Sequence, residues 1–289
     1  TVERSHPQFS PDGKELAFIE DRNRLMVLNL ETKKVRRITD GSTWYSTSGG
    51  FDYAWSPDSK WFTLEFIGNK HDPYSDIGLV SAQGNGEIIN LTNSGYSSGS
   101  PSFALDGNAI LFTTERYGMR AHASWGSLDD AMLVFLNQDA YDKFSLSKED
   151  YELYKEANSD RKKVAAKDSS KVKDVVVELK NIEDRIVRLT PNSSNMGSTL
   201  ISKDGKTLYY LASTESGRNL WKMDLNKKET KLLHKVDAGW TSLEMDKEGK
   251  TLFILNGKNM QKMNMASDDL KSIKYLAPVS YTHLRAHET

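Results

Sequence analysis

The chain has 289 residues, of which 37% are hydrophobic, 27% are charged and 10% are aromatic, and its formal net charge is −1. This is ordinary globular composition, without the basic excess that predicts nucleic-acid binding. The absence of cysteine excludes disulfides and thiolate metal sites, and no apolar run reaches the roughly 18 residues of a membrane span.

The first residues, Thr1-Val2-Glu3-Arg4, include neither an initiator Met nor the charged-then-apolar pattern of a signal peptide. We therefore expect the natural start to lie upstream, which leaves a preceding signal peptide open.

A turn signature recurs along the chain. Its copies are Ser10-Pro11-Asp12-Gly13, Ser56-Pro57-Asp58-Ser59, Ala104-Leu105-Asp106-Gly107, Ser202-Lys203-Asp204-Gly205 and, more weakly, Asp246-Lys247-Glu248-Gly249. The fourth positions of successive copies lie 46, 48, 98 and 44 residues apart, so three intervals share one period and one is about doubled. Short strands with a period of about 40–50 residues are typical of β-propeller blades.

The residues around each turn follow one pattern. An apolar residue precedes the turn in four copies, as Phe9, Trp55, Phe103 and Leu200. An almost continuously apolar run follows it, as expected for a strand buried on both faces. These runs are Leu16–Ile19, Trp61–Leu64, Ala109–Phe112, Leu208–Leu211 and Leu252–Leu255.

Further strands complete each unit. Third strands are predicted at Leu25–Leu28, Ile77–Val80 and Leu220–Met223, and fourth strands at Lys34–Thr39 and Glu87–Thr92. Four strands per unit make a propeller blade, whereas an unrelated β-sandwich would not repeat four-stranded units at a fixed spacing. The sequence therefore predicts an all-β fold of about five four-stranded blades.

The doubled interval holds a blade with about 50 additional residues. Its third strand is predicted at Ala131–Leu136. Ser147-Lys148-Glu149-Asp150 then predicts a helix start, because it combines a capping hydroxyl with an acidic residue three positions later. The charged stretch after Asp160 is expected to be an exposed linker rather than a docking surface, and strand character resumes at Val175–Leu179.

The segment from Glu178 to Thr190, ELKNIEDRIVRLT, resembles a blade strand of tricorn-type proteases. The pattern there is (D/E)-hydrophobic-x-(G/N)-I-(E/D)-x-R-hydrophobic-V-x-L. Ala123-Ser124-Trp125-Gly126, Gln138-Asp139-Ala140-Tyr141 and the helical insert resemble the bacterial branch of the same family. The resemblance covers roughly residues 1–275, whereas the turn repeats alone are of the WD40-like kind shared by many propellers.

The resemblance implies a place within a larger protease. In that family, propellers of six or seven blades gate and channel peptides towards a later catalytic region that contains a PDZ-like module. This chain then corresponds to the second propeller, with at least one blade lacking on its N-terminal side. The family's catalytic Ser, His and Glu belong to the later domains, and no stretch here resembles those domains. We therefore expect no catalytic, cofactor-binding or metal-binding residue in this chain.

The last residues differ from the repeats. The segment from Val279 to Thr289 has no blade pattern and resembles a tail produced by adapter read-through. We expect a propeller over residues 1–275, with the helical and charged insert at about 140–174, and a non-native tail over 276–289.

Gly95-Tyr96-Ser97-Ser98-Gly99 matches the G-x-S-x-G pattern of a nucleophile elbow, which requires a helix after the serine. Here Pro101 and a blade strand follow, so a loop between blades is the better interpretation.

The six histidines are His6, His71, His122, His234, His283 and His287, and none forms an H-E-x-x-H zinc motif. His122 and Ser124 would lie about 6.5 Å apart along a strand, too far for a nucleophile–base hydrogen bond.

Two other residue groups have a structural explanation. The repeated aspartates lack the spacing of a calcium loop, so we interpret them as turn formers: Asp12, Asp58, Asp106 and Asp204. An aromatic stretch between the first two blades could line a peptide surface, but core packing is the preferred interpretation: Trp44, Tyr45, Phe51, Tyr53 and Trp55.

The sequence thus favours the non-catalytic propeller of a tricorn-like serine protease. Expected partners are peptides passing through the propeller and the parent's own catalytic and PDZ-like domains, in a homo-oligomer, with no nucleic acid and no membrane span. The resemblance implies a cytoplasmic location, and a periplasmic one stays open. Two alternatives remain: the propeller of a prolyl-oligopeptidase-type hydrolase, and a TolB-like propeller that binds a protein partner.

Overall fold

The computed structural model describes residues 2–47, 49–68, 72–84, 86–122, 125–158, 172–213, 217–238, 241–256 and 259–274. Five antiparallel four-stranded sheets follow one another along the chain, and within each sheet the strands pair in chain order. We refer to these sheets as blades 1 to 5.

Blade 1 consists of β1 (Arg4–Phe9), β2 (Glu15–Glu20), β3 (Arg24–Asn29) and β4 (Val35–Arg37). Blade 2 consists of β5 (Tyr53–Trp55), β6 (Trp61–Phe66), β7 (Asp76–Ser81) and β8 (Ile89–Asn90). Blade 3 consists of β9 (Ser98–Ala104), β10 (Ala109–Thr114), β13 (Asp130–Phe135) and β14 (Ile186–Arg188). Blade 4 consists of β15 (Asn195–Ile201), β16 (Thr207–Ser213), β17 (Arg218–Asp224) and β18 (Glu229–Ala238). Blade 5 consists of β19 (Thr241–Met245), β20 (Thr251–Asn256), β21 (Asn259–Asn264) and β22 (Leu270–Ile273).

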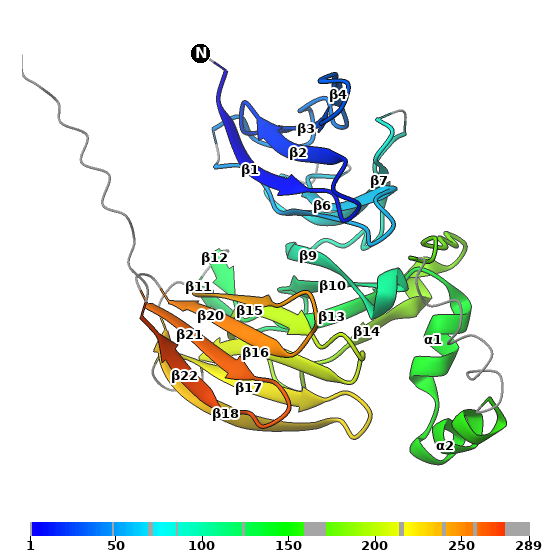
Figure 1. Cartoon of the computed structure of the whole chain (residues 1–289), viewed down its shortest axis with the longest axis vertical. Helices are drawn as coiled ribbons and strands as arrows, with labels where there is room; N and C mark the ends of the chain where they lie inside the picture. The colour runs from blue at the N-terminus through cyan, green and yellow to red at the C-terminus, as the bar shows by residue number, and fades with distance from the viewer. Residues whose placement is uncertain are drawn as a thin grey trace, which may run out of the picture.

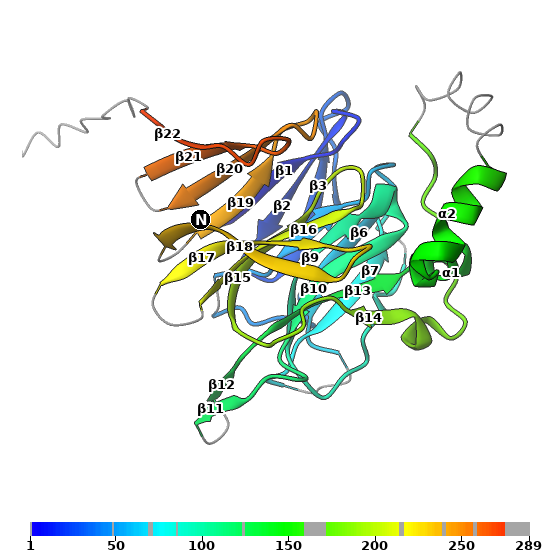
Figure 2. The ribbon, with the colours of Figure 1, turned by 90° about the horizontal axis from the view of Figure 1, so that it is seen from below.

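The blades are arranged around a common axis, from the blue blade 1 to the orange and red blade 5 (Figures 1 and 2). First strands of neighbouring blades contact each other, as β5 does with β9 and β15 with β19, which places the first strands innermost. The β-propeller predicted from the repeats is therefore confirmed, and a two-sheet sandwich is excluded.

Each seam between neighbouring blades holds a hydrophobic cluster. Along β10, Leu111 belongs to the cluster shared with blade 4, whereas Ile110 and Phe112 belong to the cluster shared with blade 2. Successive side chains of a strand point to opposite faces, so a strand between two blades needs apolar residues at every position. This is why the second strands read as continuous apolar runs.

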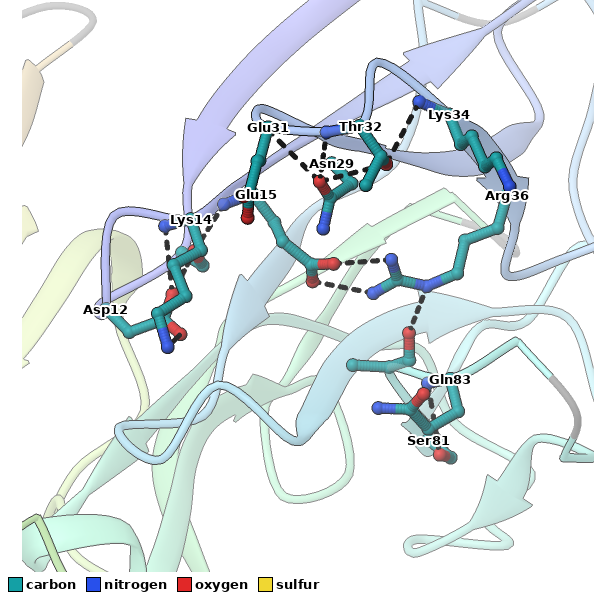
Figure 3. A network of polar contacts seen from close by, with 12 residues as sticks. Asp12, Lys14, Glu15, Asn29, Glu31, Thr32, Lys34, Arg36, Ser81 and Gln83 are labelled. Carbon is teal, nitrogen blue, oxygen red and sulfur yellow. Dashed lines mark hydrogen bonds and ion pairs between the residues drawn. The ribbon is translucent and has the colours of Figure 1, made fainter.

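Polar contacts also cross the seams. In Figure 3 the Arg36 guanidinium makes a bidentate pair with the Glu15 carboxylate, at 2.5 and 2.6 Å, within blade 1. The Nε–H of Arg36 also donates to the Ala82 carbonyl oxygen of blade 2 at 2.8 Å. Arg36 thus ties the outer part of blade 1 to its neighbour.

The face of blade 1 that points away from blade 2 is not covered by another blade among the described residues. Phe9 is 67% exposed, whereas Trp55, at the equivalent position of blade 2, is 7% exposed because blade 1 packs on it. Between described residues, no hydrogen bond or ion pair joins blade 5 to blade 1. The five blades therefore form an incomplete ring, as predicted.

A buried threonine fastens the fourth strand to the third in blades 1 to 3. The hydroxyls of Thr39, Thr92 and Thr190 accept backbone N–H groups of β3, β7 and β13 at 2.9, 3.1 and 3.2 Å. In blades 2 and 3 the same hydroxyl donates to the buried carboxylates of Asp76 and Asp130, at 2.7 Å in both cases. This contact anchors the short outer strands.

The insert in blade 3 carries two helices, α1 (Gln138–Ser145) and α2 (Lys148–Ala157), beside the strands (Figure 1). The predicted start of α2 is confirmed, because the Ser147 hydroxyl accepts the Asp150 N–H at 3.1 Å and donates to its carboxylate at 2.8 Å. The rings of Tyr141 and Phe144 lie 5.7 and 5.0 Å from that of Phe135, which fixes α1 against blade 3.

The expected strand at Val175–Leu179 is wrong. Val175 and Val177 do pack against the cluster between blades 2 and 3, but this segment forms no ladder, and its Glu178 N–H donates to the Leu136 carbonyl oxygen. A 3-10 turn at Ile182–Arg185 precedes the true fourth strand, β14, and the buried Arg185 donates to the Phe135 carbonyl oxygen. Burial alone therefore mimics a strand pattern here.

One hairpin was not predicted. It consists of β11 (Arg120–His122) and β12 (Trp125–Ser127), which pair with each other between β10 and β13.

In the described part of the chain no helix has the length and apolar character needed to cross a membrane. The expected tail, residues 276–289, lies outside the described residues.

Candidate functional site

One repeat position brings a polar side chain onto the innermost strand of every blade, or, in blade 2, directly before it. It lies four residues before the first residue of the turn signature, and it is accessible to solvent in all five blades. Its occupants are His6, Asp52, Ser100, Ser198 and Ser242. We call this set the axial ring. It was not singled out from the sequence, although aligning the repeats on their turns identifies it.

The backbone is irregular at this position in three blades. The register of the first strand shifts between Ser5 and Gln8, between Met196 and Thr199, and at the corresponding point of β9. His6 and Ser100 also adopt the left-handed region, with φ of 52° and 51°. A bulge of this kind interrupts the ladder and re-aims a side chain, and here it falls at the ring position of blades 1, 3 and 4.

Members of the ring are connected across the seams. The Ser100 hydroxyl donates to the Asp52 carboxylate at 3.1 Å, joining blade 3 to blade 2. The Leu243 N–H donates to the Ser198 hydroxyl at 3.1 Å, joining blade 5 to blade 4. The Tyr53 hydroxyl donates to the His6 carbonyl oxygen, joining blade 2 to blade 1. The ring is therefore held in place by the packing of the blades.

A second carboxylate lies behind Asp52. Glu65 occupies a position filled by Ile19, Leu211 and Leu255 in blades 1, 4 and 5 and by Thr113 in blade 3. Its carboxylate accepts the Ser100 N–H at 2.7 Å. Burial, reinforced by the charge of Asp52, raises the pKa of Glu65 to about 7. Glu65 is therefore a perturbed carboxyl at a repeat position that is apolar in three of the other four blades.

A further perturbed carboxyl lies at the same end of the strands, in blade 3. The backbone of Asp129 pairs with that of Ser194 at 2.8 and 3.0 Å. Burial, and then the neighbouring charges of Glu115 and Asp130, raise the pKa of Asp129 to about 6, although Arg218 opposes the shift. Two carboxyls at this end of the propeller therefore have pKa values raised towards neutral pH.

The G-x-S-x-G pattern has no nucleophile geometry. Gly95 and Ser97 lie in the loop before β9, and the chain continues as a strand rather than a helix. The Ser97 carbonyl oxygen accepts the Glu115 N–H at 3.0 Å, which makes this loop part of the entrance to blade 3.

The histidines lie in separate places. Nδ1 of His6 contacts the Ser5 hydroxyl at 2.9 Å, and Nε2 of His234 contacts the Asp268 carbonyl oxygen at 2.7 Å. His71, His283 and His287 lie outside the described residues, as do Ser124 and the side chain of His122. Within the described ranges, no group of three or more His, Asp or Glu side chains is arranged to hold a metal ion.

The repeated aspartates close their own turns. Asp12 accepts the Ser10 hydroxyl at 2.6 Å and the Lys14 N–H at 3.1 Å, and the Ser10 contact holds the pKa of Asp12 below its usual value. Asp58 and Asp204 accept the equivalent N–H groups, while Asp106 lies in its turn with a left-handed φ of 55°.

The aromatic stretch between blades 1 and 2 packs in the core. Phe51, Tyr53 and Trp55 are buried in the cluster between these blades, with Trp44 against it and Tyr45 beside Trp44. The axial ring, by contrast, offers accessible hydroxyls, a carboxylate and an imidazole. These groups can exchange hydrogen bonds with a peptide backbone, whose N–H and C=O groups need partners along its whole length.

Comparisons with known proteins agree with this architecture. No protein-family model matches the chain. Over 258 residues, the chain is 26% identical to a protein of Sulfurisphaera tokodaii named as a tricorn-like protease C-terminal subunit, covering 85% of this chain and 27% of that protein. Over 221 residues it is 27% identical to the uncharacterized peptidase YuxL of Bacillus subtilis, covering 73% and 30%. The chain thus spans less than a third of the length of these relatives.

Two solved structures show the same fold. The tricorn protease superposes with a TM-score of 0.63 at 12% identity, over 94% of this chain and 26% of that chain. TolB from Acinetobacter baumannii superposes with a TM-score of 0.57 at 15% identity, over 93% and 53%. The tricorn structure and the Sulfurisphaera tokodaii relative together confirm the resemblance to the tricorn-like propeller that residues 178–190 indicated, whereas TolB shows the shared fold alone.

Proposed function

We propose that this chain, which is homologous to a tricorn-like protease in its propeller region, admits extended peptides along its axis and guides them to a catalytic region elsewhere in the parent protein. The observation that carries the proposal is the axial ring, a set of accessible polar groups repeated in all five blades on the innermost strand or directly before it. A repeated set of donors and acceptors suits a ligand that is itself a repeating chain of peptide groups.

The proposal requires binding without sequence specificity and without catalysis. A narrow axial passage admits an extended chain, whereas a folded protein is too wide to enter. Under the same proposal, the parent is a cytoplasmic serine protease that forms a homo-oligomer and joins this propeller to catalytic and PDZ-like domains.

Site-specific photocrosslinking tests the proposal. A photoreactive amino acid replaces Asp52, Ser100 or Ser198 in the full chain, and a reduced, carboxymethylated polypeptide serves as the unfolded probe. Arg37 and Lys231, which are exposed on the outer strands β4 and β18, serve as control positions. We expect capture at the three axial positions and little at the controls. Equal capture at both sets, or equal capture of the folded form of the same polypeptide, would contradict guidance along the axis.

The similarity to YuxL, which is named as an uncharacterized peptidase, favours a second candidate, in which the propeller serves a peptidase other than a tricorn-like one. The uninterrupted reading frame after codon 274 separates the two. A PDZ-like module and a tricorn-type catalytic region support the first candidate, and an α/β-hydrolase region with a nucleophile elbow supports the second.

A further inference from the structure

A groove separates the helical insert from blades 3 and 4. Its volume is about 970 Å³, and it is lined by α1 and α2 on one side and by the turns at 203–206 and 224–228 on the other. Figures 1 and 2 show the two helices standing beside the strands. The lining includes the Asp106 and Asp204 turns, whereas the axial ring lies where the first strands begin. The groove is therefore distinct from the axial ring.

The helical wall of the groove is aromatic. Tyr141 and Phe144 are anchored on Phe135, while Tyr151 and Tyr154 project from α2 and remain partly exposed. Tyr154 is 39% exposed. Aromatic side chains that keep exposed surface in a concave site are well suited to contact a ligand, because they provide large area with few rotatable bonds.

Most carboxylates that line the groove are hydrogen-bonded or ion-paired, whereas several of its lysines form no ion pair with a described residue. Eight Lys and Arg residues and six Asp and Glu residues line it. Four of the six carboxylates are held by neighbouring groups: Glu152 by Lys155, Glu178 by the Gln138 N–H, Asp204 by Ser202, and Asp224 by the N–H groups of its own turn.

Four exposed lysines of the groove are not held in this way by a described carboxylate. Lys143 and Lys148 lie on the helical wall, and Lys227 and Lys228 lie on the turn between β17 and β18. Among the described residues none of these ammonium groups forms an ion pair, and Lys143 lies over the Tyr154 ring at 5.5 Å. The groove therefore carries lysines outside ion pairs on two separate elements, with aromatic rings on the helical one.

We propose that this groove binds an extended acidic peptide segment. Its carboxylates would contact the lysines of both walls, and its apolar side chains would pack on the tyrosines of α2. A single small anion could contact one wall, but engaging lysines on two separate elements requires a ligand that crosses the groove. The volume is at the upper end of the roughly 300–1,000 Å³ typical of ligand pockets, which suits a short peptide segment.

A peptide-binding assay with the full chain tests this proposal. The probe is a fluorescein-labelled peptide of about ten residues in which Glu alternates with Phe and Gly, and a matched peptide carries Gln in place of Glu. We expect the Gln peptide to bind at least about tenfold more weakly, with the affinity of the Glu peptide falling as salt screens the charges.

Charge-reversal variants locate the site. Combining Lys227→Glu with Lys228→Glu should weaken binding of the Glu peptide about tenfold or more. The matched control combines Lys33→Glu with Lys34→Glu, on the equivalent turn of blade 1, where Lys33 has the same left-handed backbone as Lys228 (φ 59° and 57°). The control should leave the affinity unchanged, and both variants should keep the wild-type circular dichroism spectrum.

A second variant tests the aromatic wall independently. Tyr154→Ala removes a partly exposed ring and should weaken binding of the Glu peptide several-fold. The proposal is overturned if the Glu and Gln peptides bind equally or the two double variants lose affinity equally. Absence of saturable binding of the Glu peptide at about millimolar concentration would also overturn it.

Discussion

Replacing Glu65 by Gln should make the stability of the propeller less dependent on pH. In the folded chain the pKa of Glu65 is about 7, compared with 4.5 for the free side chain. Between these values the folded state binds a proton that the unfolded state has released. Stability therefore falls as pH rises through this window. Gln keeps the oxygen that accepts the Ser100 N–H and removes the charge next to Asp52.

The size of the effect follows from the pKa difference. One pKa unit corresponds to about 1.4 kcal/mol, so the wild-type chain should lose up to about 3 kcal/mol relative to the variant between about pH 4.5 and pH 8. Asp129 adds a loss in the same direction at lower pH, because its pKa is raised to about 6. That loss is common to both proteins and cancels in the comparison.

Urea unfolding followed by tryptophan fluorescence provides the measurement. The free energy of unfolding is determined for both proteins at about pH 5 and about pH 8. The variant should gain stability over the wild type mainly at the higher pH. Glu87→Gln, at an exposed position on the approach to β8, controls for the loss of one negative charge. A difference between Glu65→Gln and wild type that stays the same at both pH values would refute the reasoning.

Four further outcomes are expected. Asp130→Ala should lower stability by about 3–5 kcal/mol, because it leaves the Arg188 guanidinium and a buried hydroxyl without their carboxylate. Asp76→Ala, measured by the same urea unfolding, should cost less, about 1–3 kcal/mol, because its partners are neutral donors. Ser147→Ala should cost about 1 kcal/mol locally and speed amide hydrogen exchange at the start of α2 without changing exchange in the blades. The purified chain should hydrolyse no fluorogenic peptide, and hydrolysis that co-elutes with the chain through successive columns would contradict the assignment of catalysis to another part of the parent.

The blades were predictable because their pattern is local and repeated. The turns of blades 1, 2 and 4 are closed by contacts within about five residues, as Ser10 and Asp12 show, so the shared Ser-x-Asp pattern produces the same turn in these three blades. The helix start at Ser147 is equally local. The segment Val175–Leu179 was misjudged because its valines are buried by neighbouring blades, and the sequence does not distinguish burial against a sheet from pairing within one.

The sequence by itself determined the repeating unit, its turns and the apolar strands, since these depend on residues close together along the chain. The tertiary structure alone decided the contacts that join the axial ring across the seams, the raised pKa of Glu65 and the groove beside the helices. Each of these brings together residues from different blades or from the insert, separated by tens of positions. Hydrogen bonding, burial and charge act over a few ångströms in space, whatever the distance along the chain.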